Sequence, residues 1–464
     1  MNDAPTPVSE KAPLGPVLAV GLSFFVGNLD ATVVNVATTQ IGGEFNASTA
    51  SVAWTVNGFV LAVAAILLFA GDLAGRFGAR RLYIWGLVVF TAASVVAGLS
   101  TSILILIGAR FLQGVGSALF QPAGLMLLAI SYPDQVIRQR MIGLWAAMGA
   151  SAAALGPMIG GFIVAGLGWR WIFWINLPIG LIAVWLSRQV LPSVTGQYRR
   201  VPLLGHLLFG IAVTGAAIAL MQGPSDGWNT PVPVTGILLA LLGMGVFIFW
   251  QSRSPLEVYP SRILKNRQFT LANTVGIFMN VGLFGGVFLI SILLQQSMGS
   301  DPLTAGLQLL PMMVVFVIGN LGFSRFSGKI GARPAIIAGM LAAAIAVGLL
   351  ALVISLSTSI AYIWLAVCLA IAHLGLGIAS PAMTAAMMDS VESRDTGIAG
   401  AILNVNRQLG SLVGVAIAAA LIVMNGTPQK AAPIMFVSTA VGYVIAVVAG
   451  FLLSSTPTTN PKEK

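Results

Sequence analysis

The stretch GRFGARRLYIWGL (75–87) returns later in the chain as GKIGARPAIIAGM (328–340), with its glycines, basic positions and GAR core in register. A weaker echo relates GVGSALFQPA (114–123) to HLGLGIASPA (373–382). These matches indicate two related halves with additional residues inserted between them. Paired six-helix halves, related by an axis along the membrane normal, are typical of transporters whose substrate path runs between the halves.

The composition places the chain in a lipid bilayer. Of its 464 residues, 57% are apolar and only 8% are charged, and the mean hydropathy is +0.95. Soluble domains carry about 25% charged residues, so a soluble fold of this length could not cover so much apolar surface. Cys368 is the single cysteine, which excludes an intrachain disulfide.

We predict an all-α polytopic membrane protein with 14 transmembrane helices, because apolar windows of about 20 residues can each cross a bilayer. The windows lie at about 16–40, 51–70, 82–99, 103–129, 140–165, 170–190, 202–222, 232–250, 268–296, 303–323, 334–354, 360–386, 396–424 and 433–454. The predicted organisation is a cytosolic tail, an N-terminal six-helix half, a two-helix insert with its flanking cytosolic loops, a pseudo-symmetric C-terminal six-helix half and a second cytosolic tail, at residues 1–15, 16–190, 191–267, 268–454 and 455–464.

The basic residues set the orientation. With the N-terminus inside, 19 of the 23 Lys and Arg residues fall in cytosolic segments, and only Arg170 and Lys430 fall outside. This is the positive-inside pattern of a multi-pass protein, here expected in the cytoplasmic (inner) membrane with both termini cytosolic. The net charge of +10 is thereby explained by topology, and no nucleic-acid partner is expected. The two remaining basic residues, Arg110 and Arg407, fall within spans.

Asp30 lies within the first span, in LDATVVNVA (29–37), where a carboxylate is costly and usually functional. At 1.5 Å per residue, Asp30 and Arg110 lie ~15 Å and ~12 Å from the outer ends of their spans, so the two charges are expected to pair. A functional interpretation has Asp30 alternately hold a proton and the cationic end of a substrate, with Arg110 tuning it. The alternative is a permanent structural salt bridge.

Helical phase gives the first span two polar faces. Asn28, Thr32, Asn35 and Thr39 form one stripe at 100° per residue, and Asp30 projects roughly opposite. One face could line a cavity and the other contact the fourth span, and the sequence leaves this assignment open. The stripe could equally serve as hydrogen-bonding contacts between helices.

Several stretches together resemble the major facilitator superfamily, in its 14-span branch of drug:proton antiporters. LDATVVNVA resembles the first-span motif of that branch, and GWRWIFWINLPIG (168–180) is similar to its entry into the sixth span. GDLAGRFGARR (71–81), RFLQGVGSA (110–118) and GASAAALGPMIGG (149–161) resemble the gating-loop, proton-coupling and antiporter motifs. The resemblance implies proton coupling at Asp30 and Arg110, a cytosolic gate at Gly71, Asp72, Arg76, Gly78, Arg80 and Arg81, and an exporter-type fifth span at Gly156, Pro157, Gly160 and Gly161.

The gating loop departs from the family pattern. The family places an aspartate one residue before the first arginine, where this chain has Gly75. Asp72 lies one turn earlier, at a spacing that permits a helical ion pair with Arg76. Whether Asp72 replaces the missing aspartate is open, and simple positive-inside arginines are the alternative for Arg80 and Arg81.

Other polar residues within or beside the spans are candidates for a substrate cavity, with helix–helix hydrogen bonding as the alternative. They are Asn35, Asn57, Gln113, Gln121, Gln295, Asn404 and Arg407. Arg407 has no evident acidic partner in the sequence, and it could meet carbonyls, water or an anionic substrate group.

The predicted function is proton-coupled antiport that exports small lipophilic compounds or drugs, monocationic or neutral, by alternating access. The alternative is an exporter dedicated to one metabolite or biosynthetic product. Neither a phosphate-binding GxxxxGK[ST] loop nor an HExxH or CxxC metal motif is present in the sequence. We therefore expect no enzymatic activity, no metal and no cofactor, with the proton gradient as energy source, and we expect a monomer.

Overall fold

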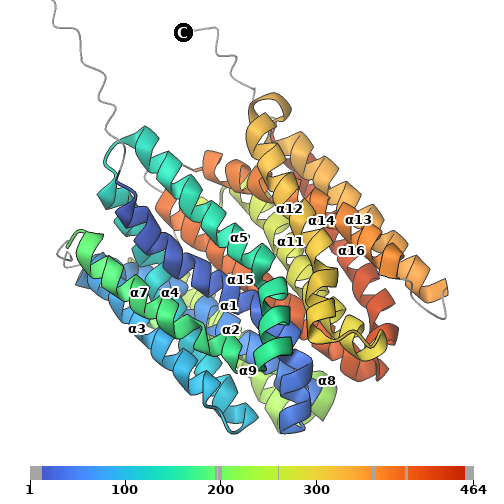
Figure 1. Cartoon of the computed structure of the whole chain (residues 1–464). Coiled ribbons are helices and arrows are strands. Elements are labelled where there is room, and N and C mark those ends of the chain that lie inside the picture. The colour runs from blue at the N-terminus through green and yellow to red at the C-terminus, as the bar shows by residue number, and fades with distance from the viewer. Residues whose placement is uncertain are drawn as a thin grey trace, which may run out of the picture.

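A computed structural model describes residues 13–193, 196, 201–259, 261–356, 362–391 and 396–454, and these residues form helices joined by short loops (Figure 1). The helices are α1 (Gly15–Phe45), α2 (Thr49–Phe77), α3 (Ala79–Gly98), α4 (Ile103–Ser131), α5 (Gln135–Leu167), α6 (Trp171–Trp174), α7 (Asn176–Val190), α8 (Leu203–Asp226), α9 (Pro231–Arg253), α10 (Ser261–Leu264), α11 (Arg267–Ile292), the π-helical turn η1 (Leu293–Ser297), α12 (Pro302–Ile330), α13 (Ala332–Leu356), α14 (Tyr362–Asp389), α15 (Thr396–Asn425) and α16 (Pro428–Leu452). The all-α prediction is confirmed.

The number of spans agrees with the sequence pattern. Within the described residues, 13 helices are long and apolar enough to cross a membrane, with α6 and α7 forming one of them. The 33-residue α5 has the length for a fourteenth. Large apolar side chains such as Leu104, Leu241 and Leu356 are 68–77% exposed, and we assign this surface to lipid contact.

The sixth predicted span, 170–190, is not one continuous helix. It is broken between Trp174 and Asn176. Pro178 explains the break, because proline has no N–H to donate to the carbonyl four residues earlier and its ring clashes with that carbonyl. Pro178 therefore falls in the first turn of a new helix, where proline is tolerated.

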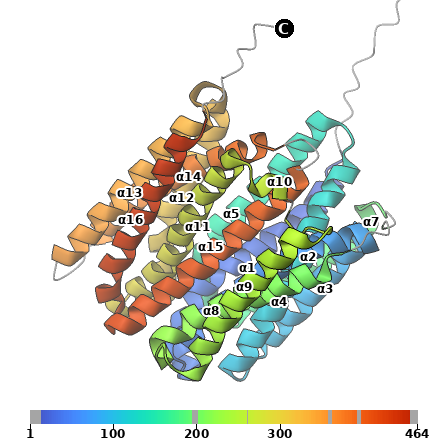
Figure 2. The ribbon, with the colours of Figure 1, turned by 180° about the vertical axis from the view of Figure 1, so that it is seen from behind.

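The spanning helices pack as two groups, seen side by side in Figures 1 and 2. Helices α1 to α5 and α7 pack on one another, as do α11 to α16. The groups meet mainly where α5 packs on α12 and α2 packs on α15. These two contacts join the second span of each group to the fifth span of the other, so they occupy equivalent positions in the two groups. The exact boundaries of the halves stay a prediction.

The inserted helices occupy the junction between the groups. Helix α8 packs against both α2 and α15, and α9 packs on α8. Glycines allow neighbouring helices elsewhere to touch through their backbones. A Cβ atom added to Gly86 of α3, for example, would lie 2.7 Å from the carbonyl oxygen of Gly116 in α4.

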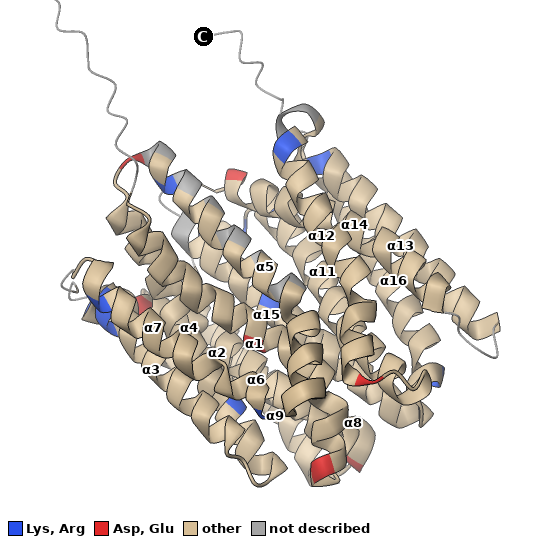
Figure 3. Cartoon of the chain, viewed as in Figure 1, with Lys and Arg blue, Asp and Glu red and all other residues tan. Residues whose placement is uncertain are grey.

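Helix α1 begins and α16 ends at the same end of the molecule, called the tail end below (Figure 1). An even number of spans requires this arrangement. Basic residues at the ends of α5, α12 and α13 lie there as well (Figure 3). The opposite end, where α1 turns into α2, is called the far end.

Candidate functional site

Asp30 of α1 and Arg110 of α4 form an ion pair inside the first helix group. Nη1 of Arg110 donates to Oδ2 of Asp30, and both side chains are 0% exposed. The contact expected from their matching depths is therefore present, whereas its role in coupling stays a prediction. Further hydrogen bonds lower the cost of burying two charges, and most donors and acceptors of this pair have them, although Nη2 of Arg110 has no hydrogen bond among the described residues.

Uncharged polar side chains satisfy the second carboxylate oxygen. Oδ1 of Asp30 accepts from the amide of Asn176 at 2.7 Å and from that of Gln113 at 3.2 Å. Oγ of Ser94 accepts from the same two amides, at 3.3 Å and 2.7 Å respectively. All of these side chains are buried. Gln113, expected as a cavity-lining candidate, instead lies in this closed network.

Arg110 makes further contacts that orient its guanidinium. Its Nε donates to the backbone carbonyl of Thr55 in α2 at 2.8 Å, and its Nη1 also donates to Oε1 of Gln113 at 2.9 Å. The rings of Phe59 and Phe173 lie 4.7 Å and 5.7 Å from its Cζ atom, within cation–π range. The network therefore joins five helices, α1, α2, α3, α4 and α7.

The two faces of α1 are now distinguished. Asp30 points into the first helix group, as described above. On the other face, the carbonyl of Asn35 accepts from Oγ of Ser291 in α11 at 2.9 Å, so this face meets the second group. Asn28 on the same stripe is partly exposed, and its amide donates to the carbonyl of Phe24 at 2.7 Å. Asn35 therefore lies where α1 meets the second group, whereas Thr32 of the same stripe packs on Gly156 of α5 within the first group.

The residues of the predicted antiporter motif in α5 pack against two helices, α1 and α12. A Cβ added to Gly160 would lie 2.7 Å from Cγ2 of Val33, and Gly156 faces Thr32, so this side of α5 packs closely on α1. On the other side, a Cβ on Gly306 of α12 would lie 2.5 Å from the carbonyl oxygen of Pro157. Gly161 similarly faces the backbone of Pro302 and Leu303. The motif thus holds together the two helix groups near the far end.

The predicted gating loop lies at the tail end. Gly78 joins α2 to α3 with φ = 92°, a conformation that favours glycine. Oδ2 of Asp72 lies 3.0 Å from Nε2 of His206 in α8, a partner that the sequence did not suggest. Arg80 donates to the carbonyl of Arg188. Gly71, Arg76 and Arg81 are exposed at this surface.

Comparison with known protein families identifies the family of this chain. The model of the Major Facilitator Superfamily matches residues 20–415 and, in a second match, 274–464. The chain belongs to the major facilitator superfamily. It is thus a multi-pass membrane transporter, as the sequence motifs predicted.

Named relatives within this superfamily are resistance proteins. The chain is 40% identical to the methylenomycin A resistance protein of Bacillus subtilis, over 94% of this chain and 93% of that one. It is 35% identical to the methylenomycin A resistance protein of Streptomyces coelicolor, over 95% and 92%. It is 31% identical to the multidrug resistance protein Stp of Mycobacterium tuberculosis, over 86% and 74%.

A solved structure supports the superfamily fold. The crystal structure of the peptide transporter POT in complex with sulfate matches with a TM-score of 0.70, covering 97% of this chain and 95% of that one. The two sequences are 16% identical, so the likeness concerns the fold alone.

The remaining residues predicted to line a substrate cavity differ in how far they are buried. Asn57 is fully buried, and its amide contacts the carbonyl of Leu412 in α15 at 3.4 Å and Sδ of Met221 in α8 at 3.0 Å. It therefore ties α2 to the other helix group and to the insert. The partly exposed candidates are Gln121, which bonds to Ser117, Gln295, which bonds to Ser291, Asn404 and Arg407.

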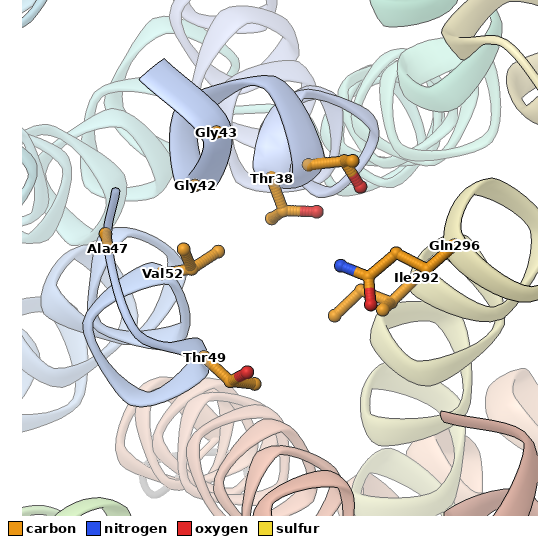
Figure 4. Close-up of a pocket in the computed structure, with 9 residues that line it drawn as sticks. Thr38, Gly42, Gly43, Ala47, Thr49, Val52, Ile292 and Gln296 are labelled. Atoms are coloured by element: carbon orange, nitrogen blue, oxygen red, sulfur yellow. The ribbon is translucent and has the colours of Figure 1, made fainter. Parts of the chain in front are cut away.

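A pocket of about 280 Å³ opens at the far end between the two helix groups (Figure 4). Thr38 and Gly42 of α1, Val52 of α2 and Gln296 of η1 line it, and none of its lining residues is charged. It lies on the far-end side of the contact between Asn35 and Ser291.

Proposed function

We propose that this transporter exports small lipophilic compounds, including drugs, in exchange for protons. The observation that carries the proposal is the buried pair of Asp30 and Arg110. A buried carboxylate held by three polar partners gains or loses a proton only with a rearrangement of those partners, which is what coupling requires. The names of the resistance relatives support the direction of transport.

The proposed mechanism starts with protonation of Asp30. Protonation removes the counter-charge of Arg110, whose Nε also bonds to the carbonyl of Thr55. Asn57, two residues further along α2, bonds across to Leu412 of α15. A movement of Arg110 can thus be transmitted through one turn of α2 to the boundary between the two helix groups.

The structure also suggests where the alternating contacts lie. The contacts of Asn35 with Ser291 and of Pro157 with Gly306 join the helix groups on the far side of the membrane centre. With the tail end cytosolic, as the positive-inside pattern indicates, this conformation is closed toward the outside. Export then requires these contacts to separate.

The test is pH-driven transport of fluorescent dyes into inverted membrane vesicles. Asp30→Asn is expected to abolish the pH-driven component while the protein still inserts and folds. Asp226→Asn, which removes an exposed carboxylate at the end of α8, is the matched control and should transport normally. Unchanged pH-driven transport by Asp30→Asn would defeat the mechanism.

A second candidate is an exporter dedicated to one compound. Two relatives that cover more than nine-tenths of the chain are named for resistance to a single antibiotic, methylenomycin A. A panel of chemically unrelated dyes and antibiotics separates the candidates. Transport of several unrelated compounds supports the broad function, whereas transport of one structural class supports the dedicated one.

A further inference from the structure

Arg407 carries a charge inside the membrane that no described acid neutralises. It lies about 16 Å along α15 from Thr396, at 1.5 Å per residue. Among the residues that the structure describes, it has no ion pair, hydrogen bond or ring contact, and its side chain is partly exposed. A charged side chain at such depth is costly and usually marks a substrate or ion path.

No other charged residue in the described spans neutralises the charge of Arg407. Asp30 is the only described acid far from a helix end, and its charge is balanced by Arg110 in a completely buried pair. The remaining described acids lie at helix ends or in loops: Glu44, Asp72, Asp134, Asp226, Glu257, Asp301 and Asp389. The interior of the described spans therefore holds one excess positive charge, at Arg407.

The surroundings of Arg407 form an accessible stripe on α15. Gly400, Asn404 and Arg407 follow at helical spacing and are all partly exposed, whereas Ser411, one turn further, is 3% exposed. Because α15 packs on α2 of the other helix group, this stripe belongs to the helix at the boundary between the groups. The stripe ends near the middle of the membrane, where a substrate site is expected in this architecture.

We propose that Arg407, with the amide of Asn404 one turn away, binds the carboxylate of a lipophilic organic acid. The planar guanidinium presents paired N–H donors that match the two oxygens of a carboxylate. This substrate class rests on the export function proposed above. It replaces the monocation suggested by the sequence, because the buried carboxylate of Asp30 is already occupied by Arg110, Gln113 and Asn176.

The test measures binding of three probes with the same ring system to the purified full-length protein in nanodiscs. The probes are pyrenebutyrate, its neutral methyl ester and a pyrenylalkyl trimethylammonium cation. Wild type should bind the acid at least ~10-fold more tightly than the ester. Arg407→Gln should remove this preference and leave ester binding unchanged, and Arg407→Lys should retain part of it.

Arg253→Gln is the matched control, because it removes one exposed arginine at the end of α9 and should preserve the preference. Unchanged ester binding shows that the Arg407 variants are folded. Equal binding of acid and ester by wild type, or an equal loss of all three probes in Arg407→Gln, would overturn the proposal.

Transport in proteoliposomes separates this inference from the export function. If wild type binds the acid through Arg407 but moves none of the probes under a pH gradient, the anion site stands and the export function fails. If wild type exports the ester and the cation but neither binds nor exports the acid, export stands and the anion site is refuted.

Discussion

Asn176 of α7 donates an amide hydrogen to Oδ1 of Asp30 in α1 at 2.7 Å, and both residues are buried. The bond joins the broken sixth span to the proposed coupling site. Since Pro178 fixes the start of α7, the break that proline imposes also sets the position of Asn176. The break that Pro178 causes in the backbone thereby helps to determine the surroundings of the Asp30 carboxylate on α1.

Removal of this amide should destabilise the protein measurably. We expect Asn176→Ala to lower the free energy of unfolding by about 1.5–3 kcal/mol, the range for a hydrogen bond to a charged group. Asn28→Ala is the control, because Asn28 is partly exposed and donates to the carbonyl of Phe24 in its own helix. Denaturant titration in detergent should show a clear difference between the variants, and equal losses would contradict the role of Asn176.

Arg110 and Asp30 should behave as a coupled pair. Arg110→Gln leaves a buried carboxylate without its counter-charge, and breaking a buried pair in this way costs about 3–5 kcal/mol. The double variant Asp30→Asn, Arg110→Gln removes both charges and should recover most of that loss in the same unfolding titration. It should nevertheless show no pH-driven transport.

A double variant as unstable as Arg110→Gln alone would contradict the coupling. In that case Arg110 would stabilise the protein mainly through Thr55, Phe59 and Phe173, and not through Asp30. Because the transport assay is separate from the unfolding titration, the double variant tests structural pairing independently of proton coupling.

Much of the fold and part of the site follow from the sequence, for physical reasons. Apolar windows predict the spans because a helix that crosses a bilayer needs about 20 apolar residues. The rise per residue of a helix was enough to predict that Asp30 and Arg110 lie at similar depth. Linear spacing cannot tell which face of a helix meets which neighbour. The contacts of Asp30 with Asn176 and of Asp72 with His206 therefore emerge only from the fold. The available sequence signal for Asn176 was a lone asparagine in the apolar stretch WIFWINLPIG (171–180).

The close contact between α5 and α12 gives a steric prediction. Gly306 lies against the carbonyl of Pro157, so Gly306→Val would overpack the boundary between the groups, at a cost of about 1–3 kcal/mol. We expect slower transport and a lower unfolding midpoint. Gly322→Val in the same helix is the control, since a Cβ there meets no atom within 4 Å. Equal transport by both variants would show that the contact is not needed for the cycle.

The contact between Asp72 and His206 predicts that the insert supports the gating loop. The side chain of His206 is 5% exposed and its Nε2 lies 3.0 Å from Oδ2 of Asp72. His206→Leu removes this polar partner and should lower the free energy of unfolding by about 1–3 kcal/mol. His206→Gln retains a donor of similar reach, so it should recover most of the stability and of the dye transport in inverted vesicles. Equal behaviour of the two variants would mean that His206 acts through the packing of its ring on Phe69, 5.4 Å away, and not through the carboxylate of Asp72.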